Sequence, residues 1–189
     1  MWRGAVLLTA GAAVLLTAGA ANASSTTALV GERQKLTVDL VGRVPGRCGF
    51  STPPADQVLP GDLSAGGSLT VGFTLDCNTP FRVRAASTNG GFRTSAEADG
   101  FANLLDYRLR LRLETDAGGL EAACNADELV SAAGGCAYYG AAAGEGLSSA
   151  DGVALHRRGA LHFTWPTARQ RLVAGRYSDT LTIVVEVRS

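Results

Sequence analysis

The sequence LDYRLRLRL at residues 105–113 alternates apolar side chains with charged ones along its whole length. Apolar residues at every second position share one face of a β-strand, whereas a helix would spread the same leucines around its circumference. The stretch therefore predicts a strand with one buried face and with Arg108, Arg110 and Arg112 on the other. Acidic residues flank the arginines at Asp106 and Glu114, which favours a solvated sheet face over a site for a polyanion.

The same period of two recurs on both sides of this stretch. It predicts strands at residues 36–41, 68–75, 81–85, 160–165 and 180–187. Glycine and proline separate these segments, as in the tight-turn sequence NGG at 89–91. Residues 51–67 have the composition of a loop, and the Gly- and Ala-rich residues 115–152 allow no assignment. Short strands joined by turns, with no amphipathic helix, predict an all-β antiparallel sandwich.

The N-terminus has the features of a secretory signal peptide. Met1-Trp2-Arg3 carries one positive charge, residues 5–20 are small or apolar, and ANA at 21–23 fits the cleavage site of a signal peptidase. A transmembrane helix needs about 20 apolar residues, and this run is shorter and only weakly hydrophobic. We therefore expect residues 1–23 to be a signal peptide. The mature chain would start at Ser24 and be exported without a membrane anchor.

Four cysteines, Cys48, Cys77, Cys124 and Cys136, lie in the expected mature chain. An even number of cysteines in an exported protein indicates disulfides, and four cysteines allow three pairings. The pairs Cys48–Cys77 and Cys124–Cys136 are favoured because each is close in sequence and brackets a hairpin or loop. A zinc site is disfavoured, since the sequence has no C-x-x-C and its two histidines, His156 and His162, have no cysteine near them.

Neither charge nor motifs indicate catalysis or nucleic-acid binding. The formal net charge is zero, with 17 basic and 17 acidic residues, so no long-range field attracts nucleic acid. The sequence contains no nucleophile elbow, P-loop or zinc-protease motif. We therefore expect a protein that is not an enzyme, with no catalytic residues, metal or cofactor.

The C-terminal sequence GRYSDTLTIVV at 175–185 resembles the end of the spore coat protein U domain, a family that includes the subunits of archaic chaperone–usher pili. Three further features occur in the order expected for this family: the cysteine pair 48 and 77, FRVR at 81–84 before NGG, and LLDYRL at 104–109. The resemblance extends over roughly residues 36–187. Its terminal motif consists of Gly175, Tyr177, Asp179 and Thr180.

The resemblance implies an incomplete immunoglobulin-like antiparallel β-sandwich of the pilin type, spanning residues 42–189. Such a domain lacks its last strand and leaves an apolar groove. A periplasmic chaperone fills the groove during export, and a neighbouring subunit fills it after assembly through an outer-membrane usher. Here the groove wall and chaperone contact would be Leu181, Ile183, Val185 and Val187, while the N-terminal extension 24–41 would donate Leu36, Val38 and Leu40.

The resemblance thus implies a subunit of a cell-surface fimbria that serves adhesion or biofilm formation. Two alternatives remain at this point. The chain could be a secreted coat component or a free-standing binding domain that does not polymerise, and residues 36–41 could be the first strand of their own domain.

Overall fold

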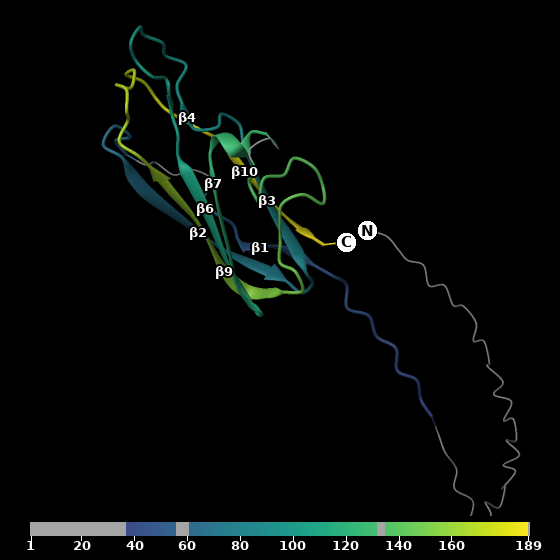
Figure 1. The fold of residues 1–189 in the computed structure, drawn as a ribbon. Helices are drawn as coiled ribbons and strands as arrows, with labels where there is room; N and C mark the ends of the chain where they lie inside the picture. The colour runs from purple at the N-terminus through teal and green to yellow at the C-terminus, as the bar shows by residue number, and fades with distance from the viewer. Residues whose placement is uncertain (1–36, 56–60, 132–134, 189) are drawn as a thin grey trace, which may run out of the picture. The chain divides into compact units, whose positions relative to one another are not determined.

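The structure is a computed structural model, which describes residues 37–55, 61–131 and 135–188. The chain separates into two units, Met1–Gly42 and Arg43–Ser189. The described part of the first unit, residues 37–42, has no regular secondary structure. All the strands belong to the second unit (Figure 1).

The described residues form ten strands and one short 3₁₀ helix, η1, at Asp127–Leu129. The strands are β1 (Cys48–Thr52), β2 (Gly67–Cys77), β3 (Phe81–Ser87), β4 (Phe92–Arg93), β5 (Leu104–Leu105), β6 (Arg108–Thr115), β7 (Gly118–Asn125), β8 (Leu147–Ser148), β9 (Ala154–Trp165) and β10 (Leu181–Val187).

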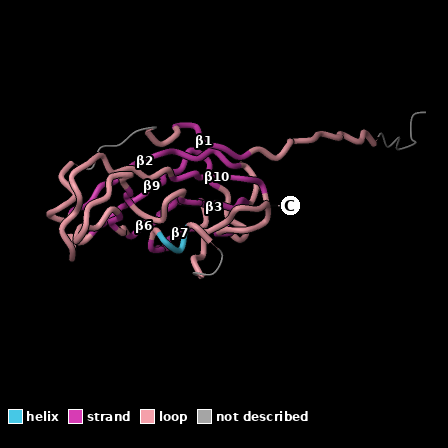
Figure 2. Tube along the Cα trace, turned by 90° about the horizontal axis from the view of Figure 1, so that it is seen from above, coloured by secondary structure: helices cyan, strands magenta, loops and turns pink. Residues whose placement is uncertain are grey.

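These strands form three antiparallel sheets. The largest has the order β1-β2-β9-β6-β7 (Figure 2). The second has the order β10-β3-β8, and β4 pairs with β5. The fold is therefore all-β, as the sequence predicts, and its arrangement is consistent with a β-sandwich.

The core is built from the alternating residues of the three central strands β2, β9 and β6. Leu109 and Leu111 of β6 lie directly across from Phe163 and Leu161 of β9, and all four side chains are buried. Further buried members of the core are Val71, Phe73, Leu75, Phe81, Val83, Leu105, Tyr107, Leu113, Leu129, Tyr138 and Trp165. The alternation of residues 105–113 thus predicts the buried face correctly, although Leu105 belongs to β5, where it pairs with Phe92 of β4, and β6 itself starts at Arg108.

The strand predicted at residues 36–41 is not formed by residues 37–41, and Leu36 lies outside the described residues. Three other segments either differ from the prediction or had no assignment from the sequence. Residues 51–52 end β1 instead of starting a loop, because Cys48–Thr52 pairs with β2. The Gly-rich residues 118–125 form β7, which pairs with β6 through a two-residue turn at Asp116 and Ala117. Strand β9 begins at Ala154, before the apolar alternation starts, and its pairing with β2 is irregular near His156, which has φ 50°.

Both predicted disulfides are present. Cys48 and Cys77 are direct cross-strand partners on β1 and β2. The Cys124–Cys136 bond ties the end of β7 to the loop that follows η1. Two disulfides indicate an oxidising environment outside the cytoplasm. Within the described ranges, no helix has the length and apolar character needed to traverse a membrane.

Candidate functional site: the open edge of β10

Strand β10 has a hydrogen-bonded neighbour on one side only. All seven of its residues pair with β3, and the strand ends the β10-β3-β8 sheet. Strand β1 ends the five-stranded sheet, and it contacts β10. The outer strands of the two sheets therefore meet on the same side of the domain, and neither has a further partner strand among the described residues.

The hydrogen bonds at the two ends of β10 show which backbone groups are unpaired. The N–H of Thr88 donates to the carbonyl of Thr180 over 3.0 Å, and the N–H of Arg188 donates to the carbonyl of Pro80 over 2.9 Å. Even-numbered residues of this strand therefore bond to β3. In an antiparallel pair, the alternate residues direct their N–H and C=O groups away from the partner strand. These are the residues predicted as a groove wall, Leu181, Ile183, Val185 and Val187, which we call the open edge.

The side chains of the open edge are incompletely covered. Leu181, Ile183 and Val185 pack against the core but are only half-buried, and Val187 is 43% exposed. Their cross-strand partners on β3 include Phe81, Val83 and Ala85, which are at most 2% exposed. Adjacent strands of one sheet thus differ sharply in burial. Apolar surface and unpaired backbone groups coincide along β10, which is the arrangement that accepts an additional strand.

Strand β1, the outer strand of the five-stranded sheet, is short and pairs only with β2 among the described strands. Its Phe50 is half-buried and packs edge-on against Phe73, with ring centroids 5.5 Å apart. The Cys48–Cys77 disulfide fixes the first residue of β1 to β2. This strand is therefore anchored without any contribution from a second neighbouring strand.

The Asp179 carboxylate fixes the start of β10. Its Oδ2 accepts hydrogen bonds of 2.7 Å from the hydroxyls of Ser87 and Tyr107, while Oδ1 accepts from the backbone N–H groups of Asn89 and Thr180 at 3.0 and 2.8 Å. Burial raises the pKa of Tyr107, and the hydrogen bond to Asp179 raises it further, so the phenol remains a neutral donor. These bonds connect β10 to β3 and to the segment just before β6.

The other residues of the C-terminal motif shape the approach to β10. The Tyr177 hydroxyl lies 2.9 Å from the carbonyl of Ala102 and 3.0 Å from that of Val173. A Cβ atom at Gly175 would come within 2.7 Å of the Thr94 hydroxyl, so only glycine fits there without displacement. The motif residues therefore have structural roles, and none of them belongs to a candidate metal-binding cluster within the described residues.

The predicted donor residues Leu36, Val38 and Leu40 all lie in the first unit, of which the structure describes residues 37–42. Leu36 lies outside the described residues. Val38 and Leu40 are 65% and 91% exposed, and residues 37–47 form no strand. The alternative in which residues 36–41 form the first strand of their own domain therefore receives no support from the described part of this segment.

A separate hollow of about 500 Å³ lies at the loops around residues 61–64 and 172–177. It includes no residue of β10, and its one lining carboxylate, Asp62, accepts two hydrogen bonds from Ser64. This hollow is distinct from the open edge.

No protein-family model matches the chain. A comparison with curated proteins also gives no match.

Proposed function

We propose that this chain is a non-enzymatic, exported structural subunit of an extracellular fibre, and that it assembles by strand addition. The open edge of β10 would receive an extended segment from another chain, and the N-terminal extension of residues 24–41 would supply such a segment to the next subunit. The observation that carries this proposal is the incompletely buried apolar edge of β10 beside fully buried partners on β3.

The chemistry of the extension fits this role. Leu36, Val38 and Leu40 occupy alternate positions, so an extended segment would present all three to one face. Burial of each such side chain contributes about 1.5–3 kcal/mol, or about 5–9 kcal/mol for three before the cost of ordering the segment. Hydrogen bonds to the unpaired N–H and C=O groups of the open edge would add to this.

The resemblance to spore coat protein U domains supplies the rest of the proposal. A periplasmic chaperone would cover the open edge during transit, an outer-membrane usher would exchange it for a neighbouring subunit, and the fibre would serve adhesion or biofilm formation. The Cys48–Cys77 and Cys124–Cys136 disulfides support a route through an oxidising compartment.

Peptide capture tests strand addition directly. The acceptor is a chain that starts at Gly42, and the ligand is a peptide of residues 33–43. We expect binding by the wild-type peptide and none by a peptide carrying V38D and L40D, because the charged groups would enter an apolar strip. A peptide carrying T37N and D39N serves as the matched control, since it alters the opposite face and should still bind.

Amide hydrogen exchange locates the bound peptide. In the free chain, the N–H groups of Leu181, Ile183 and Val185 should exchange quickly, whereas those of Thr182 and Val184 are already bonded to β3 and exchange slowly. Addition of the peptide should slow the first set and leave the second set unchanged. Equal protection of both sets in the free chain would mean that the edge is already closed, and the chain would then be a free-standing domain.

A further inference from the structure

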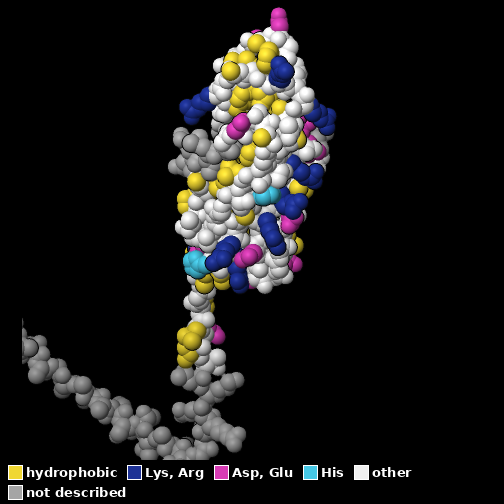
Figure 3. Space-filling view, turned by 90° about the vertical axis from the view of Figure 1, so that its left-hand side faces the viewer, with side chains coloured by type: hydrophobic (Ala, Val, Ile, Leu, Met, Phe, Trp, Pro, Cys, Tyr) yellow, Lys and Arg dark blue, Asp and Glu magenta, His cyan; other side chains and the backbone are white. Residues whose placement is uncertain are grey.

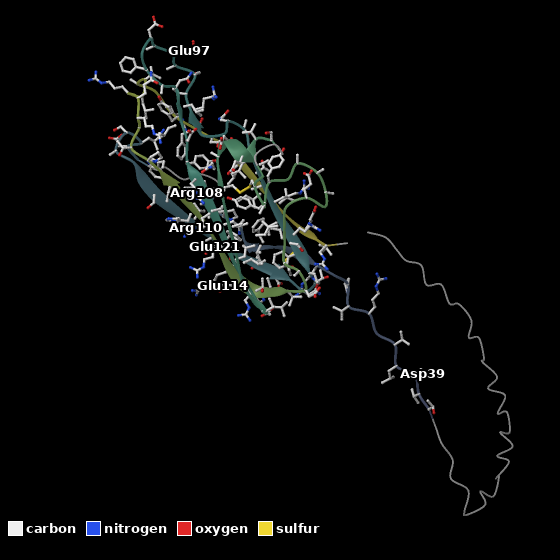
Figure 4. The ribbon with its side chains drawn as sticks, in the orientation of Figure 1. Asp39, Glu97, Arg108, Arg110, Glu114 and Glu121 are labelled. Atoms are coloured by element: carbon white, nitrogen blue, oxygen red, sulfur yellow. A yellow bond between two sulfur atoms is a disulfide. The ribbon has the colours of Figure 1, made fainter. Side chains whose placement is uncertain are left out.

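The outer face of the five-stranded sheet carries a row of arginines that strand addition at β10 does not use. Its outward residues are Arg108, Arg110 and Arg112 on β6, Arg158, Ala160, His162 and Thr164 on β9, and Glu121, Ala123 and Asn125 on β7. We call the set Arg108, Arg110, Arg112 and Arg158 the arginine face. Figure 4 shows Arg108, Arg110, Glu121 and Glu114 following one another along one side of the sheet.

The arginines of β6 lie across from shorter side chains on β9. Alternate residues of a strand are about 6.7 Å apart, so the three guanidinium groups form a straight row. Directly across from them on β9 are Thr164, His162 and Ala160. The side chains of Arg110 and Arg112 are 53% and 75% exposed. In Figure 3 arginine side chains gather along part of the surface, with acidic side chains between them.

The four arginines of this face lie beside three acidic residues, Asp106, Glu114 and Glu121, so positive charge is in excess by one. The Glu121 carboxylate lies 3.5 Å from Arg110 and 3.9 Å from Arg112, so one negative charge is shared by two guanidinium groups. Arg108 and Arg158 form no ion pair among the described residues. The other acidic residues beside the row are Asp106, two residues before Arg108, and Glu114, two residues after Arg112. An exposed ion pair of this kind contributes little, so a ligand carboxylate can replace Glu121 at small cost.

The geometry points to a linear acidic polysaccharide as the ligand, and we propose that the arginine face binds one. Guanidinium groups bind carboxylates in a bidentate manner, and a straight row suits a polymer with charges at regular intervals. The hydroxyls of Thr70 and Thr164 and the ring of His162 supply hydrogen-bonding groups beside the row. His162 already contacts Thr70, with its Nδ1 2.8 Å from the Thr70 Oγ1.

The composition of the face disfavours a single-stranded nucleic acid or a protein partner. Single-stranded nucleic acids bind on aromatic side chains that stack with the bases, and the outward positions of β2, β6, β7 and β9 include no aromatic residue. Protein interfaces bury aromatic and aliphatic anchors at their centres, and the outward positions across from the arginine row are Thr164, His162 and Ala160. A hydrated, charged polymer fits this surface best.

The test uses the mature chain with both disulfides intact and fluorescent oligogalacturonate as the probe. We expect binding at 50 mM salt that weakens steeply by 500 mM, because the arginines are exposed and screened. Since an exposed pair is worth up to about five-fold in affinity, the variant R108Q/R110Q/R112Q should lose about tenfold to a hundredfold. The variant E121Q should bind more tightly, because Arg110 and Arg112 lose their competing partner.

A matched control removes the same charge elsewhere. The variant R169Q/R171Q/R176Q changes three exposed arginines in the segment between β9 and β10 and should bind like the wild type. Equal losses in both triple variants would reduce the effect to net charge and overturn the proposal. Tighter binding of a 20-base-pair DNA than of oligogalacturonate would overturn the choice of ligand. The inference does not depend on strand addition, since the arginine face lies on β6 and β9, which belong to a different sheet from β10.

Discussion

Replacement of Asp179 by asparagine should destabilise the domain and disturb the open edge. The carboxylate accepts four hydrogen bonds, two at each oxygen. An asparagine side chain has only one oxygen, so its NH₂ group faces either two backbone N–H donors or two hydroxyls that would have to accept instead of donate. Hydrogen bonds to a charged group contribute about 1.5–3 kcal/mol each, and an unsatisfied buried donor adds a further cost. We therefore expect D179N to lower the free energy of unfolding by about 3–5 kcal/mol.

Urea denaturation monitored by tryptophan fluorescence measures this loss. Trp165 is 5% exposed and is the only tryptophan in residues 24–189, which makes it a clean reporter of unfolding. The control is D151N, since the Asp151 side chain is 98% exposed and should contribute less than about 0.5 kcal/mol. Y107F removes one donor from the same carboxylate, so a double-mutant cycle with D179N should show coupling. A loss below about 1 kcal/mol in D179N would refute the role assigned to Asp179.

Three further predictions concern packing, cross-linking and pH. A Cβ at Gly159 would overlap the ring of Phe73, so G159A should lower the free energy of unfolding by about 1–3 kcal/mol. Thermal denaturation should show this loss of stability. The control G72A, which has nothing within 4 Å of the added Cβ, should be about as stable as the wild type. The double variant C48S/C77S should lower the unfolding free energy by roughly 3–4 kcal/mol, because the disulfide closes a loop with a sequence separation of 29; an unchanged urea midpoint would contradict this. Hydrogen bonds from Arg157 and from the N–H of Leu155 hold the pKa of Asp116 below the ordinary value of 3.8 for this carboxyl group. The stability that this carboxylate contributes is therefore present above pH 3.8 and is lost as the pH falls through its lower folded pKa, so D116N should show a shallower loss of stability between pH 5 and pH 2 than the wild type.

The elements that the sequence predicts correctly are those with local patterns. Strands β2, β3 and β10 follow the alternation at residues 68–75, 81–85 and 180–187, because one face of each packs on the core. Strand β7 has no such pattern, since it lies at the edge of its sheet and its pairing with β6 follows from the tight turn that joins the two strands. The first half of β9 is also hidden, because the irregularity near His156 interrupts its alternation.

The candidate site was only partly visible in the sequence for a related reason. The shared face of Leu181, Ile183, Val185 and Val187 follows from alternation alone. The absence of a second neighbour for β10 does not, since it depends on which strands pair across the whole chain. The role of Asp179 is equally remote, because its partners Ser87 and Tyr107 lie 92 and 72 residues away in sequence.

The position of the Cys48–Cys77 disulfide has a mechanical consequence. Cys48 is the first residue of β1, and its bond leads directly to β2, which also pairs with β9. A pulling force applied to the residues before Cys48 reaches β2 through covalent sulfur atoms, and it does not strip β1 from its neighbour one hydrogen bond at a time. Tension on the N-terminal segment would therefore have to shear an interior strand out of the sheet, and this resists extension far better than unzipping an outer strand.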